Sequence, residues 1–156
     1  MTKIKAKGGS AVMAQRHWAP YELDFFPTPP WATRALIEHV FGDQAREFFK
    51  LLKCWEPAAG EGHMAEVLRE YFGQVYASDV FDYGVGYSQG SFVSKHIGLV
   101  DDRSHCPFVP DWIITNPPFI ISQEFALRAL EEARVGVALL VRTQWLEAET
   151  RYEAIL

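Results

Sequence analysis

Apolar and polar positions alternate along the chain in blocks that predict strands separated by helices. Strand-like apolar runs occupy residues 51–56 and 74–79. Between them, five apolar residues repeat with the spacing of one helix face: Met64, Val67, Leu68, Tyr71 and Phe72. This period predicts an amphipathic helix over residues 63–72. A strand, a helix and a second strand predict a βαβ unit with parallel strands and a right-handed crossover.

Helices are also expected on the amino-terminal side of this unit. Thr28 is a suitable N-cap, and Pro29 suits the first helical position. We expect that helix to end at Gly42, and a short second helix to cover residues 44–50. Gly73 follows the helix of the βαβ unit, where it is predicted to close the helix in a left-handed conformation.

The carboxyl-terminal half continues the alternation. Apolar runs predict strands over residues 111–115 and 137–141, with a helix over residues 122–134 between them. The run at 137–141 is apolar throughout, which is typical of a parallel strand buried on both faces. A very short strand or a loop is expected at residues 91–93, and a helix over residues 144–156.

These elements predict an α/β protein of Rossmann-like type with a mostly parallel central sheet. The 156 residues, 49% of them hydrophobic, suffice for one globular domain, which we assign to residues 21–156. No apolar run approaches the ~20 residues of a membrane span, and the amino terminus lacks a signal-peptide core. Cys54 and Cys106 do not have metal-site spacing. We therefore expect a cytoplasmic protein without a metal site.

Charge is distributed unevenly along the chain. The net charge is −5, from 15 basic and 20 acidic residues. Four of the basic residues and none of the acidic ones fall within residues 1–20, so the rest of the chain carries −9. We expect residues 1–20 to form a flexible basic arm. An acidic body predicts weak, salt-sensitive binding of the bare chain to DNA.

A strand that runs into two prolines is the most informative stretch. Residues 112–115 are followed by Asn116, Pro117, Pro118 and Phe119. The prolines lack N–H groups and fix φ, so they end the strand in a stiff turn at the carboxyl edge of the sheet. That turn presents an amide, a carbonyl oxygen and an aromatic face, which suits a planar substrate that carries an amine. The simpler alternative is a plain loop after a strand.

The turn after the first predicted strand is rich in small residues. Glu56 ends the strand, and glycines at 60 and 62 allow a ligand to approach the backbone. Asp79 ends the next strand, 19 residues after Gly60, where an acid in βαβ nucleotide sites binds ribose hydroxyls. The pattern is neither the dinucleotide fingerprint nor a P-loop.

Three segments together resemble the S-adenosylmethionine-dependent amino-methyltransferases of DNA, and in particular the small adenine-N6 methyltransferases of phages and prophages. The segments are Phe26-Pro27-Thr28-Pro29-Pro30, Glu56-Pro57-Ala58-Ala59-Gly60-Glu61-Gly62 and Asn116-Pro117-Pro118-Phe119. The resemblance covers residues 24–146. It implies a methyltransferase fold, S-adenosylmethionine as cofactor, and adenine N6 in DNA as the target.

The resemblance also implies roles for particular residues. The cofactor would be bound by Phe26, Pro27, Thr28, Glu56, Ala58, Gly60, Gly62, Asp79, Val80 and the residue at Ser91. Within this set, Asp79 would bind the ribose and Val80 would contact the adenine ring. The catalytic group would be Asn116, Pro117, Pro118 and Phe119. Asn116 and Pro117 would hold the target amine, and Phe119 would stack on the target base.

The chain departs from that family in two respects. Ser91 stands where relatives carry an acid that binds the adenine amino group, which predicts weak cofactor affinity. Relatives also continue with two more strands, whereas this sequence ends at Leu156. We therefore expect a truncated domain that lacks the carboxyl-terminal strands and self-associates through an open sheet edge.

Two other functions are compatible with the same residues. One is methylation of a protein glutamine amide or an RNA base, since the same Asn-Pro-Pro-aromatic turn serves those substrates. The other is a catalytically silent binding module with a methyltransferase-like fold, which the truncation and Ser91 favour.

Overall fold

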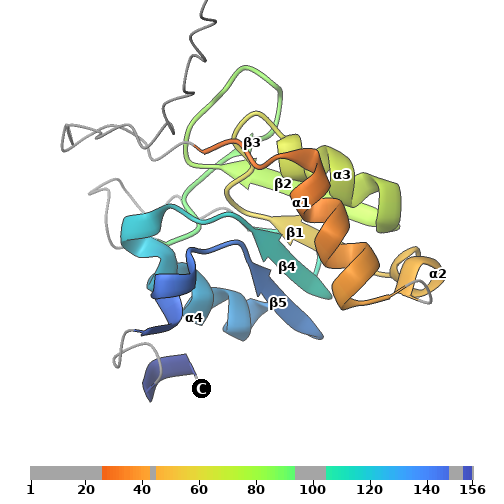
Figure 1. Ribbon diagram of the computed structural model, residues 1–156. Coiled ribbons are helices and arrows are strands. Elements are labelled where there is room, and N and C mark those ends of the chain that lie inside the picture. Colours follow the sequence, from red (N-terminus) through yellow and green to blue (C-terminus); the bar gives the residue numbers. More distant parts are fainter. Residues whose placement is uncertain (1–25, 43–44, 94–104, 148–152, 156) are drawn as a thin grey trace, which may run out of the picture.

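The computed structural model describes residues 26–42, 45–93, 105–147 and 153–155, so the predicted arm at 1–20 lies outside the described residues. Its centre is a five-stranded sheet of order β3-β2-β1-β4-β5, in which every pair is parallel (Figure 1). The strands are β1 (Lys53–Glu56), β2 (Gln74–Asp79), β3 (Ser88–Gln89), β4 (Trp112–Thr115) and β5 (Gly136–Leu139). The chain begins the sheet at its centre, extends it to β3, and then returns to the other side of β1. This Rossmann-like topology confirms the predicted α/β class.

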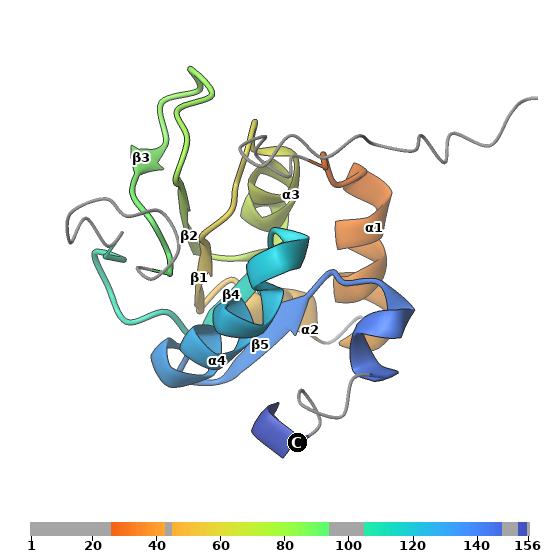
Figure 2. The ribbon, with the colours of Figure 1, turned by 90° about the vertical axis from the view of Figure 1, so that its left-hand side faces the viewer.

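Helices cover both faces of the sheet (Figure 2). One face is covered by α1 (Pro30–Ala35), the π-helical turn η1 (Leu36–Val40), α2 (Ala45–Phe49) and α3 (His63–Tyr71). The other face is covered by α4 (Ser122–Glu132), which follows the 3₁₀ turn η2 (Phe119–Ile121). The predicted βαβ unit is β1–α3–β2, with the helix and both strands at the expected positions.

The alternation of side chains in the central strands builds two separate cores. Cys54 and Ile114 point to the α3 face and belong to one buried cluster with Leu68. Their neighbours Trp55 and Ile113 point to the α4 face and belong to another. All five side chains are at most 1% exposed. Burial of a large apolar side chain of this kind contributes about 1.5–3 kcal/mol to the free energy of folding, so these side chains stabilise the two central strands, β1 and β4.

Gly73 directly follows the C-cap of α3, as predicted, but it does not have the left-handed conformation expected there. The helix α3 ends at Tyr71, and its C-cap Phe72 is extended. A Cβ atom at Gly73 would lie 2.1 Å from the carbonyl oxygen of Lys50. The Gly73 amide also donates to the carbonyl oxygens of Phe49 and Leu52, at 3.2 and 3.1 Å. Glycine is required here because two backbone segments cross closely, which periodicity does not reveal.

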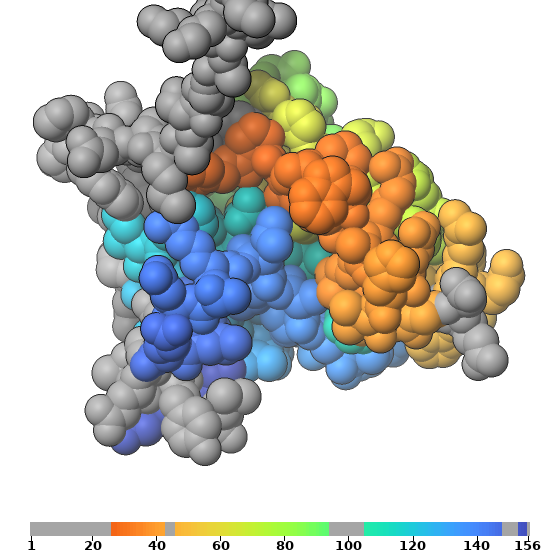
Figure 3. Space-filling view, in the orientation of Figure 1, coloured from red at the N-terminus to blue at the C-terminus, as the bar shows by residue number. Residues whose placement is uncertain are grey.

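Two elements differ from the predicted strands. The third strand is Ser88–Gln89, and residues 91–93, expected as a very short strand or a loop, do not form a strand; Phe92 is a core side chain, 2% exposed. The last strand is β5 at Gly136–Leu139, and its residues are half-buried, not buried on both faces. Among the described residues no strand pairs with the outer edge of β5. In the space-filling view, the blue segment from β5 onward lies on the surface beside the orange α1 (Figure 3).

The helix predicted over residues 144–156 is found only in part. A 3₁₀ turn, η3 (Thr143–Glu147), follows β5, and residues 153–155 are helical. The rest of the predicted helix over 144–156 lies outside the described residues. Within the part of the chain that is described, no helix is both long and apolar enough to cross a bilayer.

Candidate functional site

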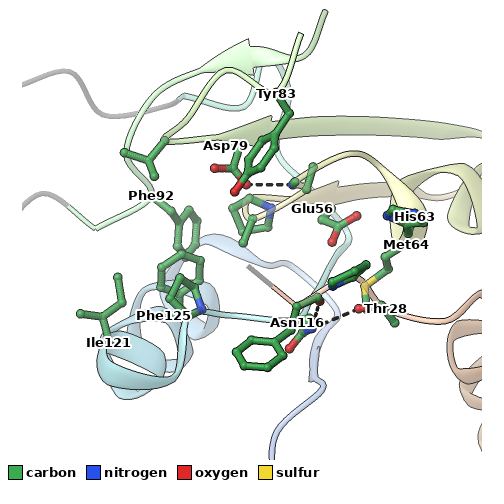
Figure 4. Close-up of a pocket in the computed structure, with 18 of the residues that line it drawn as sticks. Thr28, Glu56, His63, Met64, Asp79, Tyr83, Phe92, Asn116, Ile121 and Phe125 are labelled. Carbon is green, nitrogen blue, oxygen red and sulfur yellow. Dashed lines mark hydrogen bonds between the residues drawn. The ribbon is translucent and has the colours of Figure 1, made fainter. Parts of the chain in front are cut away.

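A pocket opens at the carboxyl edge of the sheet, where the chain leaves β1, β2 and β4 (Figure 4). It has an interior volume of about 70 Å³ and opens to solvent. The strand order reverses between β1 and β4, and open parallel sheets bind ligands at such a switch point. Its position at the switch point makes this pocket the candidate functional site.

Most of the residues singled out from the sequence lie together in this pocket. Eleven of them line it: Phe26, Pro27, Thr28, Glu56, Ala58, Gly60, Asp79, Val80, Ser91, Asn116 and Pro118. Three do not: Gly62, Pro117 and Phe119. The fold therefore brings residues from distant parts of the sequence, between positions 26 and 118, to one cavity.

Asp79 fixes the shape of the turn after β1. One carboxylate oxygen, Oδ2, accepts a hydrogen bond from the Gly60 amide at 2.8 Å, and Oδ1 accepts one from the Phe81 amide at 3.0 Å. Burial raises the pKa of Asp79, and the backbone amides of Phe81, Gly60 and Val80 oppose that rise. Gly60 itself has a positive φ of 54°, which a residue with a Cβ rarely adopts. Asp79, which the sequence suggests as a ligand-binding residue, therefore also stabilises the turn after β1 through these hydrogen bonds.

Glu56 is a buried carboxyl group at the end of β1. The residue is 2% exposed, and its Oε2 atom lacks a hydrogen-bond partner among the described residues. Burial raises the pKa of Glu56 well above its usual value, and the charge of Asp79 raises it further, whereas Arg69 and the Ala65 amide oppose the rise. An unpaired buried carboxyl group is costly. A ligand that brings a cationic hydrogen-bond donor would satisfy it.

Asn116 connects the end of β4 to the segment before α1. Its Nδ2 donates to the Phe26 carbonyl oxygen at 2.9 Å and to Thr28 Oγ1 at 3.1 Å (Figure 4). A carbonyl oxygen only accepts, so this contact determines which way the amide is turned. Oδ1 is then the atom with which Asn116 can accept a hydrogen bond from a ligand.

This contact corrects the role predicted for Thr28. The N-cap of α1 is Pro29, the helix begins at Pro30, and no side-chain hydrogen bond caps it. The Thr28 side chain is directed to Asn116 instead, and the residue is only 5% exposed. Thr28 therefore joins two loops rather than a loop and a helix.

Phe119 lies beside the pocket and does not line it. Its ring centroid is 4.8 Å from that of Phe26. The guanidinium carbon of Arg142 lies 4.5 Å from the Phe119 ring centroid. The aromatic surface assigned to a target base is therefore already in contact with a cation from the far end of the chain.

Gly62 and Pro117 are the other two predicted site residues that do not line the pocket. Gly62 is the N-cap of α3 with φ 92°, and a Cβ there would lie 2.2 Å from the Tyr87 hydroxyl oxygen. Pro117 is buried. Both belong to loops that border the pocket.

Sequence reasoning missed several residues that line the pocket: His63, Met64, Tyr83, Phe92, Val93, Ile121 and Phe125. The rings of Phe92 and Phe125 contact each other at 4.9 Å between centroids and form an apolar wall. Phe125 belongs to α4, which the sequence predicts only as a helix. Tyr83 lies in a glycine-rich interval without periodicity, so the sequence carries no signal for its position.

The described residues contain no group of three or more histidine, cysteine or acidic side chains placed to hold a metal ion. No protein-family model matches the chain, and no curated protein matches it either. The fold and the pocket define it as a Rossmann-like α/β protein with a pocket at the switch point of its sheet.

Proposed function

We propose that this chain is an S-adenosylmethionine-dependent methyltransferase that acts on an exocyclic amino group, with adenine N6 in DNA as the target. The observation that carries the proposal is the pair of hydrogen bonds from Asn116 to Phe26 and Thr28. They join the turn that would hold the amine to the segment that would cover the methionine end of the cofactor. In this proposal the sheet corresponds to the first five strands of a methyltransferase fold.

The residues at the pocket fit this cofactor. The orphaned Oε2 of Glu56 suits the ammonium group of a methionine moiety. The Asp79 carboxylate keeps lone pairs that suit ribose hydroxyls, beside the close backbone approach allowed at Gly60. Ser91 donates its hydroxyl proton to the Val93 carbonyl oxygen at 2.7 Å, so the Ser91 oxygen remains an acceptor for an adenine amine. As a neutral acceptor it would bind that amine more weakly than an acid would.

The bound cofactor would supply an electrophilic methyl group on a sulfonium centre. The contribution of the chain itself is to hold the target nitrogen. Asn116 Oδ1 and the Pro117 carbonyl oxygen would accept the two amino hydrogens, which draws the nitrogen lone pair out of conjugation with the ring. Orientation of this kind supplies roughly 7–11 kcal/mol in favourable cases. No strong base is required among the pocket residues.

A base in a duplex reaches such a pocket only after it leaves the helix stack. Unstacking and unpairing cost a few kcal/mol, and an aromatic contact at the pocket offsets part of this cost. Phe119 and Phe26, in contact at 4.8 Å, would provide that surface. The body charge of −9 argues for weak binding of the bare chain to DNA, so single-stranded substrates are the better first probes.

A methyl-transfer assay with isotope-labelled S-adenosylmethionine tests the proposal. Adenine-containing DNA, RNA of the same sequence and a glutamine-containing peptide are offered separately, with Asn116→Ala as the control. Transfer to DNA that is lost in the variant supports the proposal. Transfer to RNA or peptide alone would replace the substrate, and cofactor binding without any transfer would indicate a silent binding module.

A further inference from the structure

The segment after β5 is hydrogen-bonded to the turn that follows β4. Trp145 Nε1 donates to Ser122 Oγ at 2.7 Å, and that hydroxyl donates to the Phe119 carbonyl oxygen at 2.9 Å. Ser122 is only 2% exposed, so this relay is shielded from water. The Trp145 amide also donates to the Arg142 carbonyl oxygen at 2.8 Å, which closes the turn η3. Arg142 is therefore held between β5 and an anchored tryptophan.

This anchoring sets Arg142 on the face of the Phe119 ring, at 4.5 Å from the guanidinium carbon to the ring centroid. The residue is exposed to solvent. Among the described residues, four other arginines form ion pairs with carboxylates: Arg34, Arg69, Arg128 and Arg134. No carboxylate of the described residues pairs with Arg142 in this way. Its charge is thus available at the side of the pocket assigned to the substrate.

We propose that Arg142 is the substrate-phosphate contact of this site, a positioning residue that binds the backbone phosphate of the nucleotide whose base stacks on Phe119. The inference rests on the proposed function for the identity of that base. A planar guanidinium matches phosphate oxygens in a bidentate manner. Single-stranded nucleic acids are bound by an aromatic surface for the base together with cationic groups along the backbone. Phe119 and Arg142 bring both parts to one point.

The same geometry explains why the cation covers the ring. A long, exposed side chain on an aromatic face is held weakly, so an incoming base can take its place while the guanidinium moves to the adjacent phosphate. A neutral glutamine peptide has no phosphate to accept this cation. Arg142 therefore favours a nucleic acid over a peptide, although DNA and RNA share the phosphate chemistry.

Fluorescence anisotropy with a short, labelled, adenine-containing oligonucleotide tests the assignment on the full chain over a range of salt concentrations. DNA and RNA of the same sequence form the two arms. Arg142→Gln is expected to weaken binding of at least one of them by about tenfold and to reduce the slope of log K against log salt by about 0.7, the value for one phosphate contact on a single strand. Arg142→Lys is expected to restore the slope, since it keeps the charge, and to recover only part of the affinity.

Arg46→Gln is the matched control, because it removes the same charge from an arginine whose guanidinium carbon lies 5.2 Å from the centroid of the Tyr71 ring, away from the pocket. It is expected to leave affinity and slope unchanged. Thermal melts of each variant check that the fold is intact. Unchanged affinity and slope in Arg142→Gln, tighter binding in that variant, or no oligonucleotide binding by the wild type would each overturn the assignment.

A calorimetric titration with S-adenosylhomocysteine separates this inference from the proposed function. If the wild type binds the cofactor product but Arg142→Gln binds oligonucleotides normally, only the role of Arg142 is refuted. If the product does not bind but Arg142→Gln loses one phosphate contact, the proposed function fails and the nucleic-acid contact stands.

Discussion

Replacement of Asn116 by alanine separates the structural role of this side chain from its catalytic one. The substitution removes both hydrogen bonds from Nδ2, to the Phe26 carbonyl oxygen and to Thr28 Oγ1, together with the acceptor Oδ1. We expect Asn116→Ala to lower stability and to abolish most methyl transfer. Thr28→Val is the matched control, since it removes one of the two partners of Nδ2 and leaves Oδ1 in place.

The magnitudes follow from the bonds lost. A typical intramolecular hydrogen bond contributes about 0.5–1.5 kcal/mol net, so Asn116→Ala should lose roughly 1–3 kcal/mol and Thr28→Val about half of that. In a chain of this length each kcal/mol shifts Tm by about 2–4 °C, so Asn116→Ala should melt roughly 2–12 °C lower. Removal of one preorganised acceptor from a reacting group costs about 10²–10³ in rate, by analogy with oxyanion-hole donors.

Differential scanning fluorimetry and single-turnover methyl transfer measure the two effects. The expected pattern is a lower Tm in both variants, with a large loss of rate only in Asn116→Ala. If Thr28→Val loses rate as much as Asn116→Ala does, Asn116 acts by holding residues 26–28 and not through Oδ1. If Asn116→Ala transfers methyl groups at the wild-type rate, the catalytic assignment of the turn is wrong.

Three further changes test the other parts of the site. Glu56→Gln should raise Tm relative to the wild type more at pH 8 than at pH 5. Burial raises the pKa of Glu56 above its usual value of 4.5, so the wild type loses stability as pH rises through the folded-state pKa, whereas the neutral glutamine does not. Thermal melts that give the same Tm difference between variant and wild type at both pH values would contradict this. Asp79→Ala should weaken binding of S-adenosylhomocysteine by roughly 10–150-fold, the equivalent of a charged hydrogen bond of ~1.5–3 kcal/mol. Asp82→Ala is the control, since it removes the acceptor for the nearby Gly84 amide and should not weaken binding. Equal affinities of the wild type and Asp79→Ala in calorimetry would remove Asp79 from the site. The half-buried strand β5 has an outer edge with no partner strand among the described residues, so light scattering should show association that increases with protein concentration, and a monodisperse monomer at high concentration would count against it.

Much of the architecture was readable from the sequence because it depends on local period. The strand β2 was predicted with its observed bounds, and α3 to within one residue. Where the period was interrupted, the prediction was less definite. The glycine-rich interval around β3 left residues 91–93 as either a short strand or a loop, and it did not reveal that tertiary packing makes Phe92 a core residue. The apolar run of β5 predicted burial on both faces, but burial depends on the neighbours of a strand and not on its composition.

The sequence by itself determined which short segments hold the candidate chemistry, because each segment ends a strand with residues that stop the ladder. Parallel strands place all their carboxyl ends at one edge, so Glu56, Asp79 and Asn116 had to converge once the strands were parallel. Only the tertiary structure decided how those side chains are oriented. The amide of Asn116 is turned by a carbonyl oxygen 90 positions earlier in the chain, and the ring of Phe119 is covered by Arg142 from beyond the last strand. Contacts between residues so far apart in sequence leave no periodic trace, because they depend on how the completed sheet positions its loops.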